Sequence, residues 1–111
     1  MSTKVYTETS PARLLLVDDH PLLRRAVAEL LSLESDLSVV GQASNGQEAL
    51  DFLAKNNVDL VILDHKMPIL TGMETLKEIK ARNFNTKTIL FTVSDSGEDI
   101  QEALKLGVDG Y

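Results

Sequence analysis

The sequence contains no cysteine, and this absence excludes disulfide bonds and thiolate metal sites. A chain without cysteine also fits a reducing compartment, so we expect a cytoplasmic protein. Basic residues are few: 11 Lys and Arg stand against 17 Asp and Glu, which leaves a formal net charge of −6. Binding to nucleic acid requires clustered positive charge, so we expect any contact with DNA to come from outside this chain.

Long hydrophobic runs are also missing. No stretch is long enough to span a membrane, so we expect no membrane partner. The polar start lacks the apolar centre of a signal peptide, and we expect residues 1–12 to form a flexible tail. At 111 residues, of which 43% are hydrophobic and 25% charged, the chain is long enough for one domain with its own core but not for two.

What the sequence does contain is a regular alternation of strand and helix patterns. Apolar runs rich in Val, Ile and Leu predict strands over 13–17, 37–41, 58–63 and 88–93, with a fifth strand beginning at 110–111. Helical periodicity predicts helices over 21–33, about 46–55, about 72–81 and 96–106. Asn45 and Thr71 each stand three residues before a glutamate, which predicts a capping box at the start of two helices. The alternation predicts the α/β class, with a parallel sheet covered by helices on both faces.

Acidic residues follow two of the predicted strands. Asp18 and Asp19 come directly after the first strand, and Asp64 comes directly after the third. Each acid alone would be an ordinary residue of a strand-to-helix turn. Together, at the carboxyl edge where parallel sheets bind ligands, they form a cluster whose charges repel unless a cation neutralises them. Carboxylate oxygens suit Mg²⁺, a carboxylate can attack phosphorus, and the hydroxyl of Thr92 can donate to a phosphoryl oxygen. The pattern therefore predicts a Mg²⁺-dependent phosphoryl site.

Four segments carry a resemblance to a known family: LLLVDDHPLLRRAV, SNGQEAL, DLVILDHKMPILTGMETL and ILFTVSDSGEDIQEALKLGVDGY. They resemble the receiver domain of bacterial two-component response regulators, and most of all the nitrate/nitrite (NarL/NarP-like) branch of the LuxR-type regulators. The resemblance covers residues 13–111. It implies a flavodoxin-like (CheY-like) doubly wound sheet with strand order 2-1-3-4-5. We expect this receiver domain to lack the end of the fifth strand and the fifth helix.

The resemblance also implies roles for individual residues. Asp64 matches the phosphoacceptor, which a sensor histidine kinase phosphorylates, and it also matches a ligand of the Mg²⁺ ion. Asp18 and Asp19 match the acidic pair that binds Mg²⁺, with Asp19 as the direct ligand. The backbone carbonyl of Lys66 matches a further metal ligand. Thr92 matches the switch hydroxyl and Tyr111 the switch aromatic. Pro68 and Gly72 match the loop after the acceptor. The resemblance further implies homodimerisation on phosphorylation, slow self-dephosphorylation rather than a dedicated enzyme, and a DNA-binding domain after this chain.

The chain departs from the family pattern at two places. Lys66 is a cation where the family usually carries an uncharged residue, and we expect its side chain to shield the phosphoryl group. The family also has a lysine three residues after the switch aromatic, beyond Tyr111. We expect the natural protein to continue past that point.

Two other functions compete with the signalling switch. An aspartyl-nucleophile phosphohydrolase needs a second acid two residues after the nucleophile, where this chain has Lys66. A receiver-like interaction module that takes no phosphate stays an alternative. His20 and His65 flank the acids as candidate metal ligands, but ordinary loop histidines are favoured because no other His or Cys lies near them. We expect Arg24 and Arg25 to lie on a solvated helix face. We expect only packing in the core or a loop for Met67, Met73 and Phe91.

Overall fold

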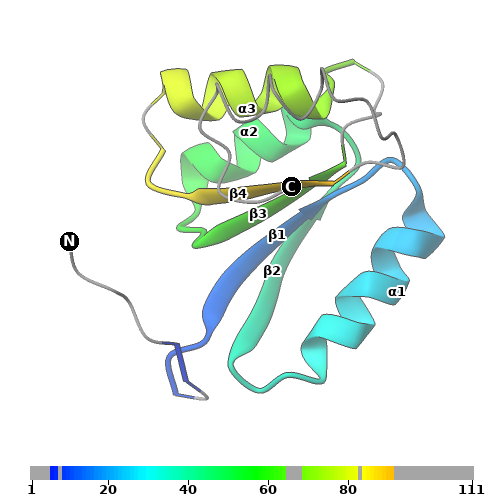
Figure 1. Cartoon of the computed structure of the whole chain (residues 1–111), viewed down its shortest axis with the longest axis vertical. Coiled ribbons are helices and arrows are strands. Elements are labelled where there is room, and N and C mark those ends of the chain that lie inside the picture. The colour runs from blue at the N-terminus through cyan, green and yellow to red at the C-terminus, as the bar shows by residue number, and fades with distance from the viewer. Residues whose placement is uncertain (1–5, 8, 65–68, 83, 92–111) are drawn as a thin grey trace.

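The computed structural model describes residues 6–7, 9–64, 69–82 and 84–91. Within this part of the chain, three helices flank a sheet of four strands (Figure 1). The helices are α1 (Pro21–Ser32), α2 (Gly46–Lys55) and α3 (Gly72–Ala81). The strands are β1 (Ala12–Val17), β2 (Leu37–Ala43), β3 (Leu60–Asp64) and β4 (Lys87–Phe91). None of the described helices is long and apolar enough to cross a membrane.

The sheet is parallel throughout, in the order β2-β1-β3-β4. This order confirms the predicted flavodoxin-like arrangement over its first four strands. The expected fifth strand and the helix predicted over 96–106 lie outside the described residues. Strand β1 is central, and its run Leu14–Val17 is buried on both faces. A continuous apolar run of this kind is typical of a parallel strand covered by helices.

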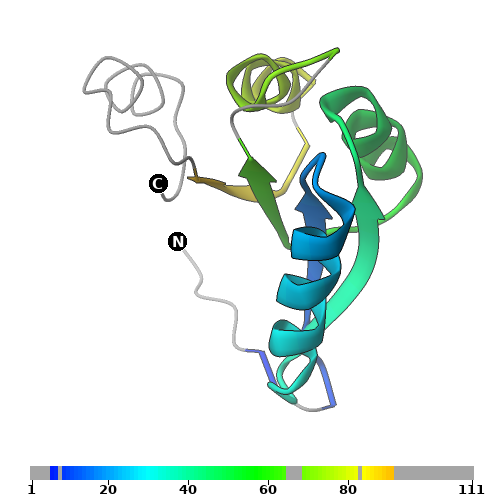
Figure 2. The same cartoon turned by 90° about the vertical axis from the view of Figure 1, so that its right-hand side faces the viewer.

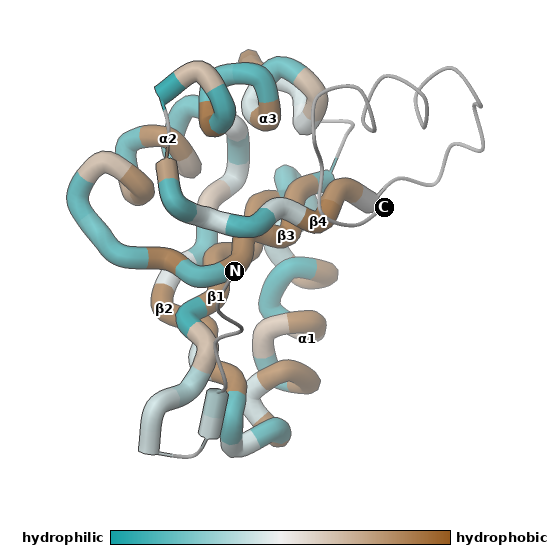
Figure 3. Tube along the Cα trace, turned by 60° about the vertical axis from the view of Figure 1, so that its left-hand side comes forward, coloured by the Kyte–Doolittle hydropathy of each residue, from teal (hydrophilic) through white to brown (hydrophobic). Residues whose placement is uncertain are grey.

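The helices lie on both faces of the sheet, as predicted. Helices α2 and α3 cover one face, and α1 covers the other beside β1 and β2 (Figure 2). Hydropathy follows the same division, because the strands in the middle of the molecule are apolar and the helices alternate between polar and apolar residues (Figure 3).

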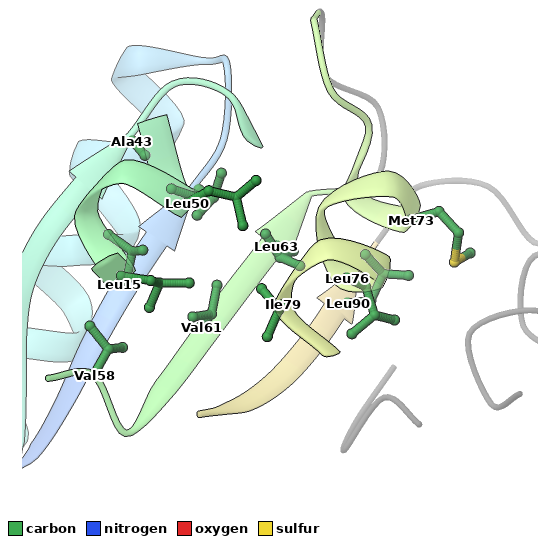
Figure 4. Close-up of a cluster of buried hydrophobic side chains, with 13 residues drawn as sticks. Leu15, Ala43, Leu50, Val58, Val61, Leu63, Met73, Leu76, Ile79 and Leu90 are labelled. Carbon is green, nitrogen blue, oxygen red and sulfur yellow. The ribbon is translucent and has the colours of Figure 1, made fainter. Parts of the chain in front are cut away.

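The main hydrophobic core lies between the sheet and the pair α2 and α3 (Figure 4). Leu15, Val61 and Leu63 point from the strands toward Leu50 of α2 and Leu76 of α3, and each of these five side chains is at most 1% exposed. Met73, for which packing was predicted, is also buried there. On the opposite face, α1 has no buried residue, and its Leu30 is 66% exposed.

The two predicted capping boxes form differently. Thr71 and Glu74 complete theirs: the Thr71 hydroxyl accepts from Glu74 N at 3.1 Å, and Glu74 Oε1 accepts from Thr71 N at 3.0 Å. Asn45 accepts from Glu48 N at 2.9 Å, but Glu48 Oε1 accepts from the backbone and hydroxyl of Ser44 instead of from Asn45 N. The backbone N–H of Ser44 is the main cause that lowers the pKa of Glu48. The capping box predicted at Asn45 is therefore wrong in one of its two hydrogen bonds, because Glu48 accepts from the N–H one residue earlier, at Ser44.

The first residue of α2 must be glycine because α3 lies against it. A Cβ at Gly46 would stand 1.9 Å from Thr75 Oγ1 and 2.9 Å from Leu70 Cβ. The Thr75 hydroxyl cannot turn away freely, since it donates to the Thr71 carbonyl at 2.7 Å.

We expect Gly46→Ala to lower the free energy of unfolding by about 1–3 kcal/mol, the usual cost of overpacking a close contact. Urea denaturation measures this change. Thr75→Ala removes the nearest clashing atom, so the double variant should lose less stability than the sum of the two single variants. Strict additivity would mean that the contact between α2 and α3 does not exclude the methyl group.

Candidate functional site

Parallel pairing of β1 with β3 brings two carboxylates to the same edge of the sheet. Val17 lies opposite Leu63 in the register, so the following residues Asp18 and Asp64 come side by side. The backbone N–H of Asp18 donates to the Ala43 carbonyl at 3.0 Å, which holds the end of β1 against β2. Both acids are buried, with Asp18 5% and Asp64 9% exposed. Strand pairing thus fixes where these two carboxylates stand.

Four side chains converge at this edge. One ligand atom from each of Asp18, Asp19, His20 and Asp64 lies within 4.8 Å of the other three. The structure brings the three acids together, while their roles as ligands and acceptor stay predictions. A group of oxygen and nitrogen atoms this compact is able to surround a single metal ion.

His20, which the sequence offered as a candidate ligand but did not favour, is a member of the cluster. Its Nδ1 lies 2.9 Å from Asp18 Oδ1 and 3.0 Å from Asp19 Oδ1, and its backbone N–H also donates to Asp18 Oδ1 at 2.9 Å. The hydrogen bond with Asp18 raises the pKa of the imidazole, and the charge of Asp19 acts in the same direction. The interpretation of His20 as an ordinary loop histidine stays a prediction, while the structure adds these contacts with Asp18 and Asp19. The available signal was the triplet Asp18-Asp19-His20 itself, placed at a strand end.

The buried oxygen of Asp19 tests whether the cluster fits a cation. Asp19 Oδ1 is shielded from solvent and has no hydrogen-bond partner among the described residues, although His20 Nδ1 lies 3.0 Å away. A protonated Nδ1 has one N–H, and its hydrogen bond goes to Asp18. A buried anionic oxygen without a donor is costly, and a bound cation would remove that cost. The three carboxylates therefore fit a hard divalent ion such as Mg²⁺.

Arg24 supports the cluster from α1. Its Nη1 donates to the backbone carbonyl of Asp18 at 2.6 Å, and its Nε donates to Gln42 Oε1 at 3.0 Å. One guanidinium thereby joins α1, the end of β1 and β2. The prediction that Arg24 and Arg25 form a solvated helix face is wrong for Arg24, while Arg25 is exposed as expected.

Several predicted site residues cannot be placed. Phe91, the last residue of β4, pairs with Asp64 in the β3–β4 register, so the described part of β4 ends beside Asp64. Thr92, Lys66 and Tyr111 lie outside the described residues, and their roles stay predictions. The same holds for Pro68, His65 and Met67, and for the side chain of Phe91. Gly72 is placed at the start of α3, directly after the Thr71 cap.

The sequence of this chain matches one known protein family over most of its length. The family described as the response regulator receiver domain matches residues 14–111. The chain belongs to this family.

Curated relatives of the receiver chain confirm the predicted branch. The chain is 43% identical over 101 residues to the nitrate/nitrite response regulator protein NarL of Escherichia coli (strain K12), an alignment that covers 91% of the chain and 47% of NarL. It is 36% identical to the nitrate/nitrite response regulator protein NarP of the same strain, over 94% of the chain and 48% of NarP. The receiver chain thus spans about half the length of the curated relatives it matches.

Solved structures confirm the fold. The signal receiver domain of the putative response regulator NarL from Mycobacterium tuberculosis is 31% identical with a TM-score of 0.85, over 90% of this chain and 81% of that chain. A LuxR-family DNA-binding response regulator from Staphylococcus aureus is 32% identical, also with a TM-score of 0.85, over 90% of this chain and 83% of that chain. The receiver chain therefore has the CheY-like fold of LuxR-type response regulators.

Proposed function

We propose that this receiver domain takes a phosphoryl group on Asp64 from a sensor histidine kinase, in the presence of Mg²⁺. The observation that carries the proposal is the position of Asp64 at the end of β3, buried and within ligand distance of Asp18 and Asp19.

The proposed transfer of the phosphoryl group is a simple displacement at phosphorus. A carboxylate oxygen of Asp64 attacks phosphorus, the bond from phosphorus to the kinase's histidine nitrogen breaks, and the electron pair returns to that nitrogen. Asp18, Asp19, Asp64 and the backbone carbonyl of Lys66 would hold Mg²⁺, which offsets negative charge on the transferred group when it is bound. Arg24 and the Ala43 carbonyl keep the backbone of Asp18 in place, so the chain's own part is positioning.

The response would act on a larger protein. We propose that Thr92 moves toward the phosphoryl group and Tyr111 turns inward, which shifts an existing equilibrium between two conformations. Homodimerisation and control of a DNA-binding domain that follows this chain would be the output, in the cytoplasm. The relatives' greater length and the LuxR-family neighbour support this proposal.

Incubation with acetyl phosphate tests the function against its two competitors. We expect intact-mass spectrometry to show one phosphoryl group added per chain, only with Mg²⁺ present, and lost slowly on standing. An interaction module would show no addition. A phosphohydrolase would release inorganic phosphate over many turnovers without accumulating the phosphorylated chain.

We predict that Lys66 prolongs the life of the acyl phosphate. An ammonium near the phosphoryl oxygens would obstruct the attacking water, and it would also weaken Mg²⁺ binding through like-charge repulsion. Lys66→Asn should therefore speed phosphate loss several-fold, as measured by the decay of the phosphorylated mass. The same variant should also bind Mg²⁺ more tightly. Lys77→Asn, on the exposed surface of α3, is the matched charge control. Equal decay rates in both variants and the unaltered chain would show that the Lys66 side chain has no such effect.

A further inference from the structure

The position of His20 adds a nitrogen donor to the proposed cation site. We infer that His20 Nδ1 is a direct metal ligand, and that the site therefore prefers a divalent transition ion of the manganese-to-zinc series over Mg²⁺. This inference rests on the cation site proposed above.

The distances in the cluster are those of neighbouring ligands. Two atoms bound at roughly 2.1 Å and at right angles around an octahedral ion lie about 3.0 Å apart. His20 Nδ1 lies 2.9 Å from Asp18 Oδ1 and 3.0 Å from Asp19 Oδ1. The contact with Asp18 is also a hydrogen bond, but the contact with Asp19 is not, since Asp19 Oδ1 has no hydrogen-bond partner. The contact with Asp19 is an ion pair when the imidazole is protonated, and the same spacing suits two ligands of a shared ion when Nδ1 carries no proton.

The backbone holds the imidazole in this place. His20 is the N-cap of α1, with φ −100° and ψ 99°, and Pro21 follows at the first helical position. A residue before proline is restricted to extended conformations, and the His20 N–H is already bonded to Asp18 Oδ1. Nδ1 thus reaches the carboxylates without any change in the backbone of the turn. A metal ion bound at Nδ1 would replace the proton there, which would leave to solvent, and the ring would keep its proton on Nε2.

The donor set decides which ions the site prefers. Three carboxylates alone suit Mg²⁺, which takes oxygen ligands and keeps several waters. Replacing one oxygen by an imidazole nitrogen favours later ions of the first transition row, whose affinity for nitrogen rises along the series. His20 would therefore raise the affinity for Co²⁺ or Ni²⁺ far more than the affinity for Mg²⁺.

Mn²⁺ bound to the chain gives a direct readout of the nitrogen ligand. At a fixed pH of about 8, where imidazole binds metals as the neutral ring, we expect pulsed EPR to show ¹⁴N modulation of bound Mn²⁺. The chain has 2 histidines, so an imidazole signal has only two sources. His20→Gln should abolish the modulation, and His65→Gln should keep it. Bound Mn²⁺ without ¹⁴N modulation, or modulation that disappears only in His65→Gln, would overturn the inference.

Affinities separate a ligand from a residue that merely holds the turn. We expect the ratio of the Co²⁺ to the Mg²⁺ association constant to fall at least tenfold in His20→Gln, in line with the usual cost of disturbing a metal's ligand sphere. Equal losses for both ions would indicate a structural role and contradict the inference. If neither ion binds the unaltered chain, or if Asp19→Asn leaves binding of both unchanged, the proposed cation site fails as well. Mn²⁺ binding without nitrogen leaves that site standing and removes only His20. Metal-free melting curves of each variant check that the fold is intact.

Discussion

Replacing Asp64 with Asn is expected to abolish phosphorylation of the chain by acetyl phosphate. The amide keeps the size and shape of the side chain but is neutral and cannot form an acyl phosphate. Asp64 ends β3 and is 9% exposed, so Asn fits the same space without a cavity. Intact-mass spectrometry after incubation with donor and Mg²⁺ should show one added phosphoryl group on the unaltered chain and none on the variant.

A matched control removes a carboxylate away from the site. Asp51 is exposed on α2 and accepts a hydrogen bond from Gln47 Nε2 at 3.1 Å, so Asp51→Asn makes the same chemical change on the surface. It should be phosphorylated like the unaltered chain. Labelling of Asp64→Asn at the control's rate would mean that another residue is the acceptor, and peptide mapping would identify it.

The first four strands and their helices could be predicted because each depends on local patterns. Continuous apolar runs predict buried parallel strands, and helical periodicity separates them. The errors lie at element ends: β2 runs to Ala43, two residues past its predicted end, and β3 begins at Leu60, two residues after its predicted start. Such ends depend on the partner strand's hydrogen bonds, which no local pattern records. The strand order came from family resemblance, since alternation alone does not select it.

The acids of the site could be predicted for a related reason. Asp18 follows β1 and Asp64 ends β3, and because these two strands pair directly, backbone geometry places both acids, whatever rotamers they adopt. The contacts of Arg24 and His20 could not be predicted, because they depend on which way a side chain turns after packing. Arg24 reaches the Asp18 carbonyl only because α1 crosses β1 and β2 at that end. The Ser44 contact of Glu48 was missed similarly, since the capping-box pattern does not say which neighbouring N–H the glutamate meets.

Mg²⁺ is expected to raise the melting temperature of the chain, because the ion binds the folded carboxylate cluster and not the unfolded chain. At a Mg²⁺ concentration about 100 times its dissociation constant, the gain in free energy of unfolding is roughly 2.7 kcal/mol. For a domain of this size that gain corresponds to roughly 10 to 20 °C. Thermal melts in EDTA and across a Mg²⁺ titration, at constant ionic strength, measure it.

Asp19→Asn should change the melting temperature in opposite directions without and with Mg²⁺, relative to the unaltered chain. Without metal, the variant loses one of three clustered negative charges, and its buried oxygen at that position becomes part of a neutral amide. Its melting temperature in EDTA should therefore equal or exceed that of the unaltered chain. With Mg²⁺, it should gain less than about half as much, because a ligand and a charge are missing. Asp51→Asn should keep the full gain, since its carboxylate is exposed on α2. An equal Mg²⁺ gain in Asp19→Asn, or a gain reproduced by NaCl of the same ionic strength, would show that the stabilisation arises from general screening of charge and not from a bound ion between Asp18, Asp19 and Asp64.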